Sequence, residues 1–209
     1  MVYIDGEKYY KHQSSINNIT HENFVYKILN FWFEKKLDYK KWFTDTDNYD
    51  EYIKNNFTSI LKEAEKGILL DWLQNSLSYL AMIILLNVFS KKIYKNTKKE
   101  FINDKKALLF TEMGLDMHLD KLSAEEKIFV LKPYQDSENE NDQILGIKIL
   151  EKLIEKENIL EQRNILKKSL FNARNLFKII QKYHRFPIRN MILNRESTEE
   201  EIDYIDENY

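Results

Sequence analysis

The stretch SLSYLAMIILLNVFSKKIY at residues 76–94 decides the fold. It is apolar on nearly all sides until Lys91, which predicts a helix in the buried centre of the protein. Its longest apolar run, LAMIILL at 80–86, is much shorter than the roughly 20 residues that a membrane-spanning helix needs. We therefore expect the chain to fold around this helix, without insertion into a membrane.

The composition of the chain favours an all-α, globular protein. Among 209 residues there are only 4 glycines and 2 prolines, which indicates long helices rather than sheets joined by tight turns. Hydrophobic residues make up 43% and charged residues 32%, a balance that excludes a disordered chain. The net charge of −2 gives no global attraction to nucleic acid or to an anionic membrane. Cysteine is absent, and we find no signal peptide, so we expect a cytoplasmic protein.

Apolar residues at helical spacing predict further helices on both sides of the central one. Gly67 is a natural C-cap for the helix that precedes it. Short loops between consecutive helices predict antiparallel pairs, and no low-complexity linker divides residues 21–209, so we expect one helical domain. Besides the central helix, the helices predicted from this spacing cover about 24–36, 47–66, 137–157 and 159–184.

Capping boxes predict three further helix starts. In a capping box a hydroxyl accepts from the backbone N–H of a glutamate three residues later, and that glutamate accepts in return. Pro133 is expected to end the second of these helices, and Ser137 or Asp136 to cap the helix over 137–157. The boxes pair Thr97 with Glu100, Ser123 with Glu126, and Thr198 with Glu201.

Residues 1–20 differ from the rest of the chain. VYIDGEKYY at 2–10 places Asp5-Gly6 between two short apolar–polar alternations, which is typical of a β-hairpin. A loosely ordered arm is the alternative, because an isolated hairpin needs support from the helical body. The polar run KHQSSINNIT at 11–20 is interpreted as a linker.

Standard catalytic signatures are missing. There is no glycine-rich phosphate loop, no HExxH and no GxSxG, and the four histidines lack the spacing of metal ligands, so no cofactor and no metal is predicted. KKIYKNTKK at 91–99 is a local basic patch. It suits either the C-terminal end of a helix dipole or a contact with RNA. The RNA contact would use Lys91, Lys92, Lys95, Lys98 and Lys99.

Three arginines stand close together in YHRFPIRNMILNREST at 183–198. The segment Arg185-Phe186-Pro187 must leave helical geometry. Arg185 and Arg189 cannot lie in the core without partners, and their guanidinium groups suit carboxylates, phosphate or helix carbonyls. Both a structural role and a ligand-binding role are therefore open.

The same stretch resembles the C-terminal signature of the DUF924 family, approximately FGRFPHRNxxLGRxSTxEE. This family is an uncharacterised group with a tetratricopeptide-like fold, so the resemblance implies antiparallel helix pairs in a right-handed superhelix. It extends over about residues 21–205 and carries no assigned activity. Other segments resemble family motifs in the same order, namely ILNFWF at 28–33, KKWF at 40–43, FINDKKAL at 101–108 and PYQDSENENDQ at 133–143.

The chain also departs from the family pattern. LNVFSKK at 86–92 stands where the family has LDQFPRN, so Asn87 replaces an aspartate and Lys91 an arginine. Asp136 and Ile188 replace histidines, and a histidine general base at those positions is therefore lost. Residues that match the family pattern are Asp104, Ser137, Glu138, Gln143, Arg185, Arg189, Asn190, Arg195, Ser197 and Thr198.

These observations predict a non-catalytic binding or scaffold module whose concave surface holds a protein or peptide partner. The alternative is an enzyme, or a degenerate enzyme, that binds a small anionic or phosphorylated ligand through Arg185 and Arg189. RNA binding is a third hypothesis, although nucleic acid is not expected as a partner, and a homo-oligomer is left open. Under the first hypothesis Arg185, Arg189 and Arg195 meet Glu138 and Asp104 in one polar cluster, with Asn190 and Gln143 beside it.

Overall fold

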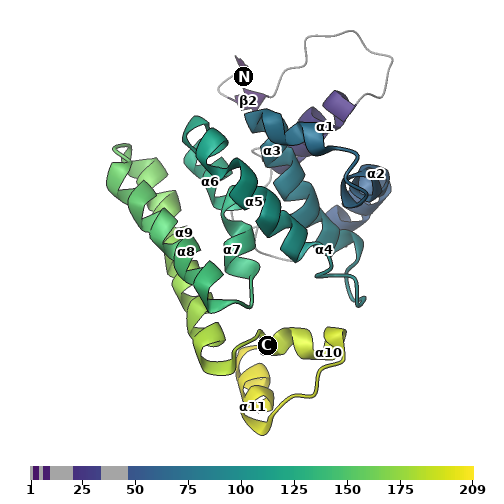
Figure 1. Ribbon diagram of the computed structural model, residues 1–209, viewed down its shortest axis with the longest axis vertical. Coiled ribbons are helices and arrows are strands. Elements are labelled where there is room, and N and C mark those ends of the chain that lie inside the picture. The colour runs from purple at the N-terminus through teal and green to yellow at the C-terminus, as the bar shows by residue number, and fades with distance from the viewer. Residues whose placement is uncertain (1, 5–6, 10–20, 34–46) are drawn as a thin grey trace.

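The structure, a computed structural model, describes residues 2–4, 7–9, 21–33 and 47–209. It is built almost entirely of helices, and the all-α fold is therefore confirmed (Figure 1). Its elements are β1 Val2–Ile4, β2 Glu7–Tyr9, α1 His21–Phe33, α2 Asp47–Glu65, η2 Leu70–Gln74, α3 Ser76–Ile83, η3 Ile84–Phe89, α4 Ser90–Ile93, α5 Asp104–His118, η4 Leu119–Lys121, α6 Ala124–Val130, α7 Lys132–Asp136, α8 Glu140–Lys156, α9 Leu160–Tyr183, η5 Pro187–Arg189, α10 Asn190–Leu193 and α11 Glu199–Asn208.

The central segment is the most buried part of the protein, as predicted. α3, the π-helical turn η3 and α4 follow one another without a break, and every residue from Tyr79 to Ser90 is buried. Ser76–Ile93 is long and apolar enough to cross a membrane, but 72% of it is buried inside the protein. A single hydrophobic cluster surrounds this segment and includes residues from α1 through α9.

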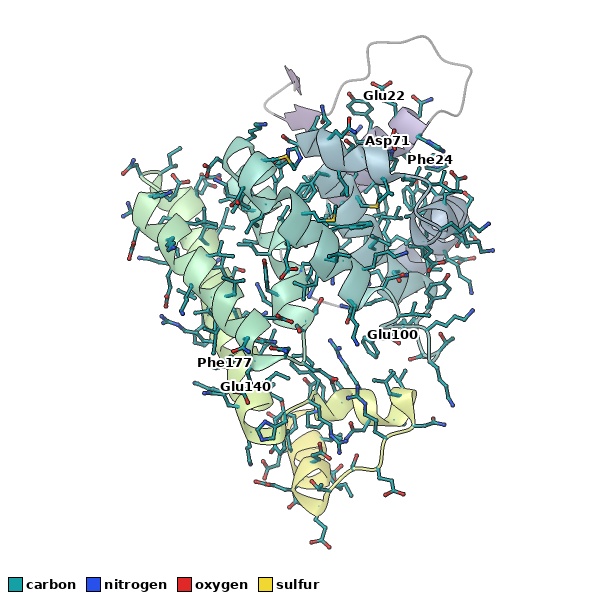
Figure 2. The ribbon with its side chains drawn as sticks, in the orientation of Figure 1. Glu22, Phe24, Asp71, Glu100, Glu140 and Phe177 are labelled. Carbon is teal, nitrogen blue, oxygen red and sulfur yellow. The ribbon has the colours of Figure 1, made fainter. Side chains whose placement is uncertain are left out.

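Glycines allow two pairs of helices to approach closely. A Cβ atom at Gly114 in α5 would overlap the ring of Tyr79 in α3, so α5 packs directly on the central segment. The Tyr79 hydroxyl donates to the Thr111 carbonyl at 2.7 Å and fixes the same contact. A Cβ at Gly146 would lie 2.6 Å from Cβ of Tyr134, which brings α8 against α7. Side chains fill the space between these helices (Figure 2).

The C-terminal residues form a separate layer below the main body. α8 and α9 pack along each other as an antiparallel pair, and α9 leads the chain down to η5, α10 and α11 (Figure 1). Of the two alternatives for the N-terminal residues, the paired strands of a hairpin are present, with Val2 opposite Tyr9, and the predicted turn at Asp5-Gly6 lies outside the described residues. The predicted linker at 11–20 and the KKWF motif at 40–43 lie outside the described residues.

Two of the three capping boxes are present, at Ser123 and at Thr198. The helix start predicted at Thr97 is wrong, because residues 97–103 form turns and α5 begins only at Asp104. The Thr97 hydroxyl donates to the Tyr94 carbonyl at 2.6 Å instead. Asn103 explains the late start: it is buried and donates to Glu65 at 2.7 Å and to Ser90 at 2.8 Å, contacts that hold the chain in turns up to α5.

The start of α8 also differs from the prediction. Asn139 is its N-cap and accepts from the backbone N–H of Asn141 at 2.8 Å. Ser137 and Asp136, the predicted caps, have other partners: the Ser137 hydroxyl donates to Asp142 at 2.6 Å, and Asp136 binds cations. The helix that Pro133 was expected to end finishes at Val130, and Pro133 itself lies in the first turn of α7.

Candidate functional site

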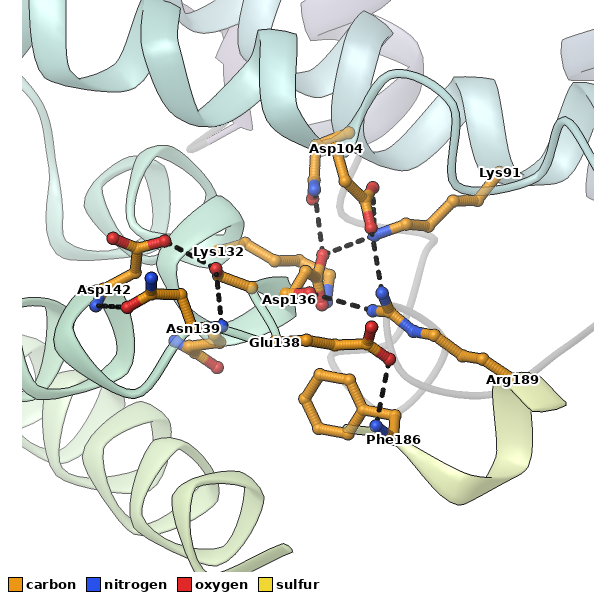
Figure 3. A network of polar contacts seen from close by, with 12 residues as sticks. Lys91, Asp104, Lys132, Asp136, Glu138, Asn139, Asp142, Phe186 and Arg189 are labelled. Carbon is orange, nitrogen blue, oxygen red and sulfur yellow. Dashed lines mark hydrogen bonds and ion pairs between the residues drawn. The ribbon is translucent and has the colours of Figure 1, made fainter. Parts of the chain in front are cut away.

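Arg189 lies at the junction between the C-terminal layer and the main body. α9 ends at Tyr183 and is capped by His184, whose φ of 57° is left-handed, and the turn η5 then brings Arg189 back toward α5 and α7. Its side chain is 11% exposed. It donates to Asp104 Oδ2 at 3.3 Å and to the Asp136 carbonyl at 3.0 Å (Figure 3). Its guanidinium carbon lies 4.3 Å from the centre of the Phe101 ring and 4.6 Å from that of the Phe186 ring, so two aromatic side chains also contact this charge.

Two carboxylates and three cations form a continuous network around this contact. Lys91 bridges the carboxylates, with Nζ 3.0 Å from Asp104 and 2.6 Å from Asp136. Lys132 adds a third cation at 3.1 Å from Asp136. The Asp104 and Asp136 side chains are only 15% and 10% exposed. The neighbouring cations must therefore compensate for the hydration that each carboxylate loses on burial. The network joins α4, α5, α7 and η5 (Figure 3).

The two carboxylates of this network differ in pKa. Burial alone would raise the pKa of Asp136, but Lys132, Lys91 and Arg189 hold it well below its ordinary value. Burial raises the pKa of Asp104, and the nearby charge of Asp136 adds to this effect, against the opposing influence of Lys91 and Arg189. Asp136 is therefore the fixed negative charge of the network, and Asp104 is the group that accepts a proton more readily.

Glu138 fastens both ends of the segment that carries Arg189. Arg195 binds it with both terminal nitrogens, at 2.9 and 2.8 Å, and the backbone N–H of Phe186 donates to it at 3.0 Å. Burial alone would raise the pKa of Glu138, but these hydrogen bonds lower it below its ordinary value. Two of the three arginines of the predicted cluster thus meet its two carboxylates, although the sequence did not assign the individual pairs.

Arg185 does not join this cluster, and the predicted contact with Glu138 or Asp104 is wrong. Arg185 instead binds both oxygens of Glu201 in α11, at 2.6 and 2.7 Å. The turn at Pro187 separates the two arginines, so Arg185 faces α11 while Arg189 faces α5. The hydrogen bond from Arg185 is the main reason that the pKa of Glu201 is lowered to about 2.

Asn190 and Gln143 support the loops that carry these charges. Asn190 donates to Ser197 at 3.0 Å and to Glu201 at 3.3 Å, within the C-terminal layer. Gln143 is buried and donates to the carbonyls of Gln135 and Ser137 at 2.7 and 2.8 Å, which fixes the loop between α7 and α8. At the end of α8 nearest the C-terminal layer, Glu140 lies 3.2 Å from the exposed His184 (Figure 2).

Most of the basic patch at 91–99 is neutralised within the protein. Lys91 belongs to the network above, and Lys92 and Lys95 both bind Asp50 in α2, at 2.8 and 2.9 Å. Burial alone would raise the pKa of Asp50, but these two lysines lower it below its ordinary value. Lys98 and Lys99 lie beyond these ion pairs. The patch therefore offers much less free positive charge than its sequence indicates.

A cleft of about 700 Å³ lies beside the network. One wall is α5 with the turn before it, another is α7 with the start of α8, and the C-terminal layer contributes Arg189, Leu193 and Arg195. The charged side chains of the network belong to these walls, and each of them is already paired within the protein. Among the residues that the structure describes, Lys98, Lys105 and Glu112 in these walls make no ion pair. The apolar side chains that line the cleft are Phe101, Ile102, Leu108, Leu109, Pro133 and Leu193.

The described residues contain no cluster of metal-ligating side chains. No group of three or more histidines, aspartates or glutamates within them is placed to hold a metal ion. His118 is buried and lies 2.8 Å from the Leu73 carbonyl and 3.2 Å from the Ser76 hydroxyl, so it serves the core. Asp136 and Glu138, the carboxylates beside the cleft whose pKa is lowered, are held by cations of the same chain.

The profile of the family described as "Bacterial protein of unknown function (DUF924)" matches residues 28–208. The chain belongs to the DUF924 family. It is also similar to a solved structure, the protein of unknown function ATU0120 from Agrobacterium tumefaciens, with 26% identity and a TM-score of 0.78. The superposition covers 90% of this chain and 100% of that one. No curated protein matches this chain.

Residues that differ from the DUF924 pattern contact one another in this structure. Asn87 and Asp136, which stand where the family has aspartate and histidine, are joined by a hydrogen bond of 2.8 Å. In the family pattern the first residue would accept and the second would donate, whereas here Asn87 donates and Asp136 accepts. Lys91, where the family has arginine, binds the same carboxylate. Sequence reasoning treated these changes separately and missed the roles of Asn87, Lys91 and Lys132.

Replacing Arg189 by glutamine should lower the free energy of unfolding by about 2–4 kcal/mol. The change removes a cation from a buried network and leaves the Asp136 carbonyl without its donor. Urea titration followed by circular dichroism measures the loss. Arg174→Gln is the matched control, because Arg174 forms an exposed pair with Glu151 and should cost less than about 0.5 kcal/mol. Equal losses in the two variants would contradict a structural role for Arg189.

The pair between Arg185 and Glu201 should make the C-terminal layer sensitive to acid. Because the pKa of Glu201 is lowered to about 2, its stabilisation is complete above the ordinary glutamate pKa and is lost as the pH falls toward 2. Glu201→Gln removes this titration. The gap in unfolding free energy between the wild type and Glu201→Gln should therefore narrow between about pH 5 and pH 2. A gap of constant size for Glu201→Gln would refute the assignment.

Proposed function

We propose that this protein is a non-catalytic binding module, and that the cleft between α5 and the C-terminal layer receives a segment of a protein partner. The observation that carries the proposal is the pairing of the arginines of residues 183–198. Arg185 binds Glu201, Arg189 binds Asp104, and Arg195 binds Glu138. These paired charges therefore serve to hold the walls of the cleft in place.

The alternative of an enzyme with a small anionic ligand draws less support from this geometry. Such a ligand would need guanidinium groups that face the cleft with donors to spare. Arg185 lies outside the cleft lining, and Arg189 is 11% exposed with contacts to Asp104 and to the Asp136 carbonyl. A phosphate at Arg189 would compete with the Asp104 carboxylate, which is largely buried beside it.

The apolar wall of the cleft favours a protein segment as the ligand. Ile102 and Leu109 are 59% and 52% exposed, and both line the cleft next to charged residues. Exposed apolar groups with a polar rim are typical of surfaces that bind other proteins. A tetratricopeptide-like superhelix, which presents such a surface on its concave side, and a cytoplasmic location are parts of the same proposal.

Selection from a displayed peptide library against the full-length protein tests this proposal. We expect peptides that bind the wild type and lose at least about tenfold in affinity to Leu109→Glu, because the new charge would be buried against an apolar ligand. Phe171→Glu is the matched control: Phe171 is 70% exposed on α9, away from the cleft, and its replacement should leave the affinity unchanged. Failure to select any peptide, or peptides that tolerate Leu109→Glu, would overturn the proposal.

A further inference from the structure

One face of α5 is apolar and open to solvent along the helix. Leu109, Met113 and Met117 follow at steps of four residues and are 52%, 53% and 55% exposed. Residues four apart are neighbours on a helix surface, so the three side chains form one row. The opposite face of the helix packs on the core, where Gly114 meets Tyr79. Met is common on surfaces that bind other proteins, because its side chain adapts to its partner.

Charges without partners flank this row. Lys105 lies one turn before Leu109, and Glu112 and Asp116 lie one turn apart in the second half of the helix. Among the described residues, none of these three side chains has an ion pair or a side-chain hydrogen bond. Two like charges at this spacing repel each other, so the isolated chain gains nothing from Glu112 beside Asp116. The face thus carries one positive end and one negative end.

This charge order is self-complementary when two copies of α5 lie antiparallel. With Leu109 of both copies on the two-fold axis, Lys105 lies level with Met113 of the second copy. The rise of about 1.5 Å per residue then places Lys105 within about 5 Å, along the axis, of both Glu112 and Asp116 of that copy. The two-fold axis makes the same contact twice, whereas a parallel pairing would set like charges against each other.

We propose that the exposed face of α5 binds a second copy of this chain in a symmetric, antiparallel dimer. The inference rests on the proposed function, because Leu109 both lines the cleft and belongs to this face of α5. It names a second copy of the chain as the protein that binds there. Among the described residues, no other helix carries three exposed large apolar side chains at steps of four residues. The α5 face combines an apolar row with matching charges. A contact over one helix is small, so the dimer dissociates on dilution.

Sedimentation of the full chain over a range of concentrations at low salt tests the dimer. Lys105→Glu makes all three flanking charges negative, and Glu112→Lys with Asp116→Lys makes all three positive. Each variant alone should dimerise at least about tenfold more weakly than the wild type, because its copies repel each other. An equal mixture of the two should recover the dimer, since every contact is again between opposite charges. Misfolding of either variant would not produce this recovery.

Matched controls exclude an effect of net charge alone. Lys148→Glu, and Glu155→Lys with Glu161→Lys, change the net charge by the same amounts on α8 and α9, and both should dimerise like the wild type. A wild type that stays monomeric at its highest soluble concentration, or α5 variants that dimerise normally, would overturn the inference. If peptides selected on the cleft still depend on Leu109 in that case, the binding module stands without the dimer. If no peptide binds either, both proposals fall.

Discussion

The contact between Arg189 and Asp104 holds the C-terminal layer against the main body, and the surrounding structure depends on it. Buried carboxylates are tolerated only with cations beside them, and Asp104 and Asp136 share Lys91 and Arg189 for this purpose. These residues come from α4, α5, α7 and η5, so the network fixes four elements that are distant in the sequence. The cleft exists because this junction holds the C-terminal layer beside α5 and α7.

Much of the fold could be predicted, because local signals determine it. The central helix followed from a run of apolar residues, and the capping boxes at Ser123 and Thr198 followed from two side chains within one turn of helix. The box at Thr97 had the same local pattern and failed. There a tertiary contact overrode it, since buried Asn103 binds Glu65 of α2 and delays the helix. Sequence spacing carries no information about such a partner, 38 positions away.

The sequence predicted which types of residue form the candidate site, but only some of the contacts between them. Arginines near the end of the chain needed carboxylates, and Asp104 and Glu138 were predicted for all three of them. Arg189 and Arg195 bind these two carboxylates, whereas Arg185 does not. Glu201 was assigned to a capping box alone, although one carboxylate serves both the box and Arg185. The lysines at 91–95 were interpreted as complements of a helix dipole or as an RNA contact, because their acidic partners lie on other helices. In each case the missing information was the position of a distant element.

In this DUF924 protein, a binding module and an anion-binding enzyme differ in the role of the arginines. In a binding module they stabilise the fold, whereas in an anion-binding enzyme they bind a ligand. NMR of the arginine side-chain N–H groups during titration with inorganic phosphate tests this role most directly. Arg174, which is 57% exposed, serves as the internal reference. We predict that the signals of Arg185, Arg189 and Arg195 stay unchanged at phosphate concentrations that already shift Arg174. A saturable shift of the Arg189 or Arg195 signal at lower phosphate than Arg174 requires would contradict a purely structural cluster.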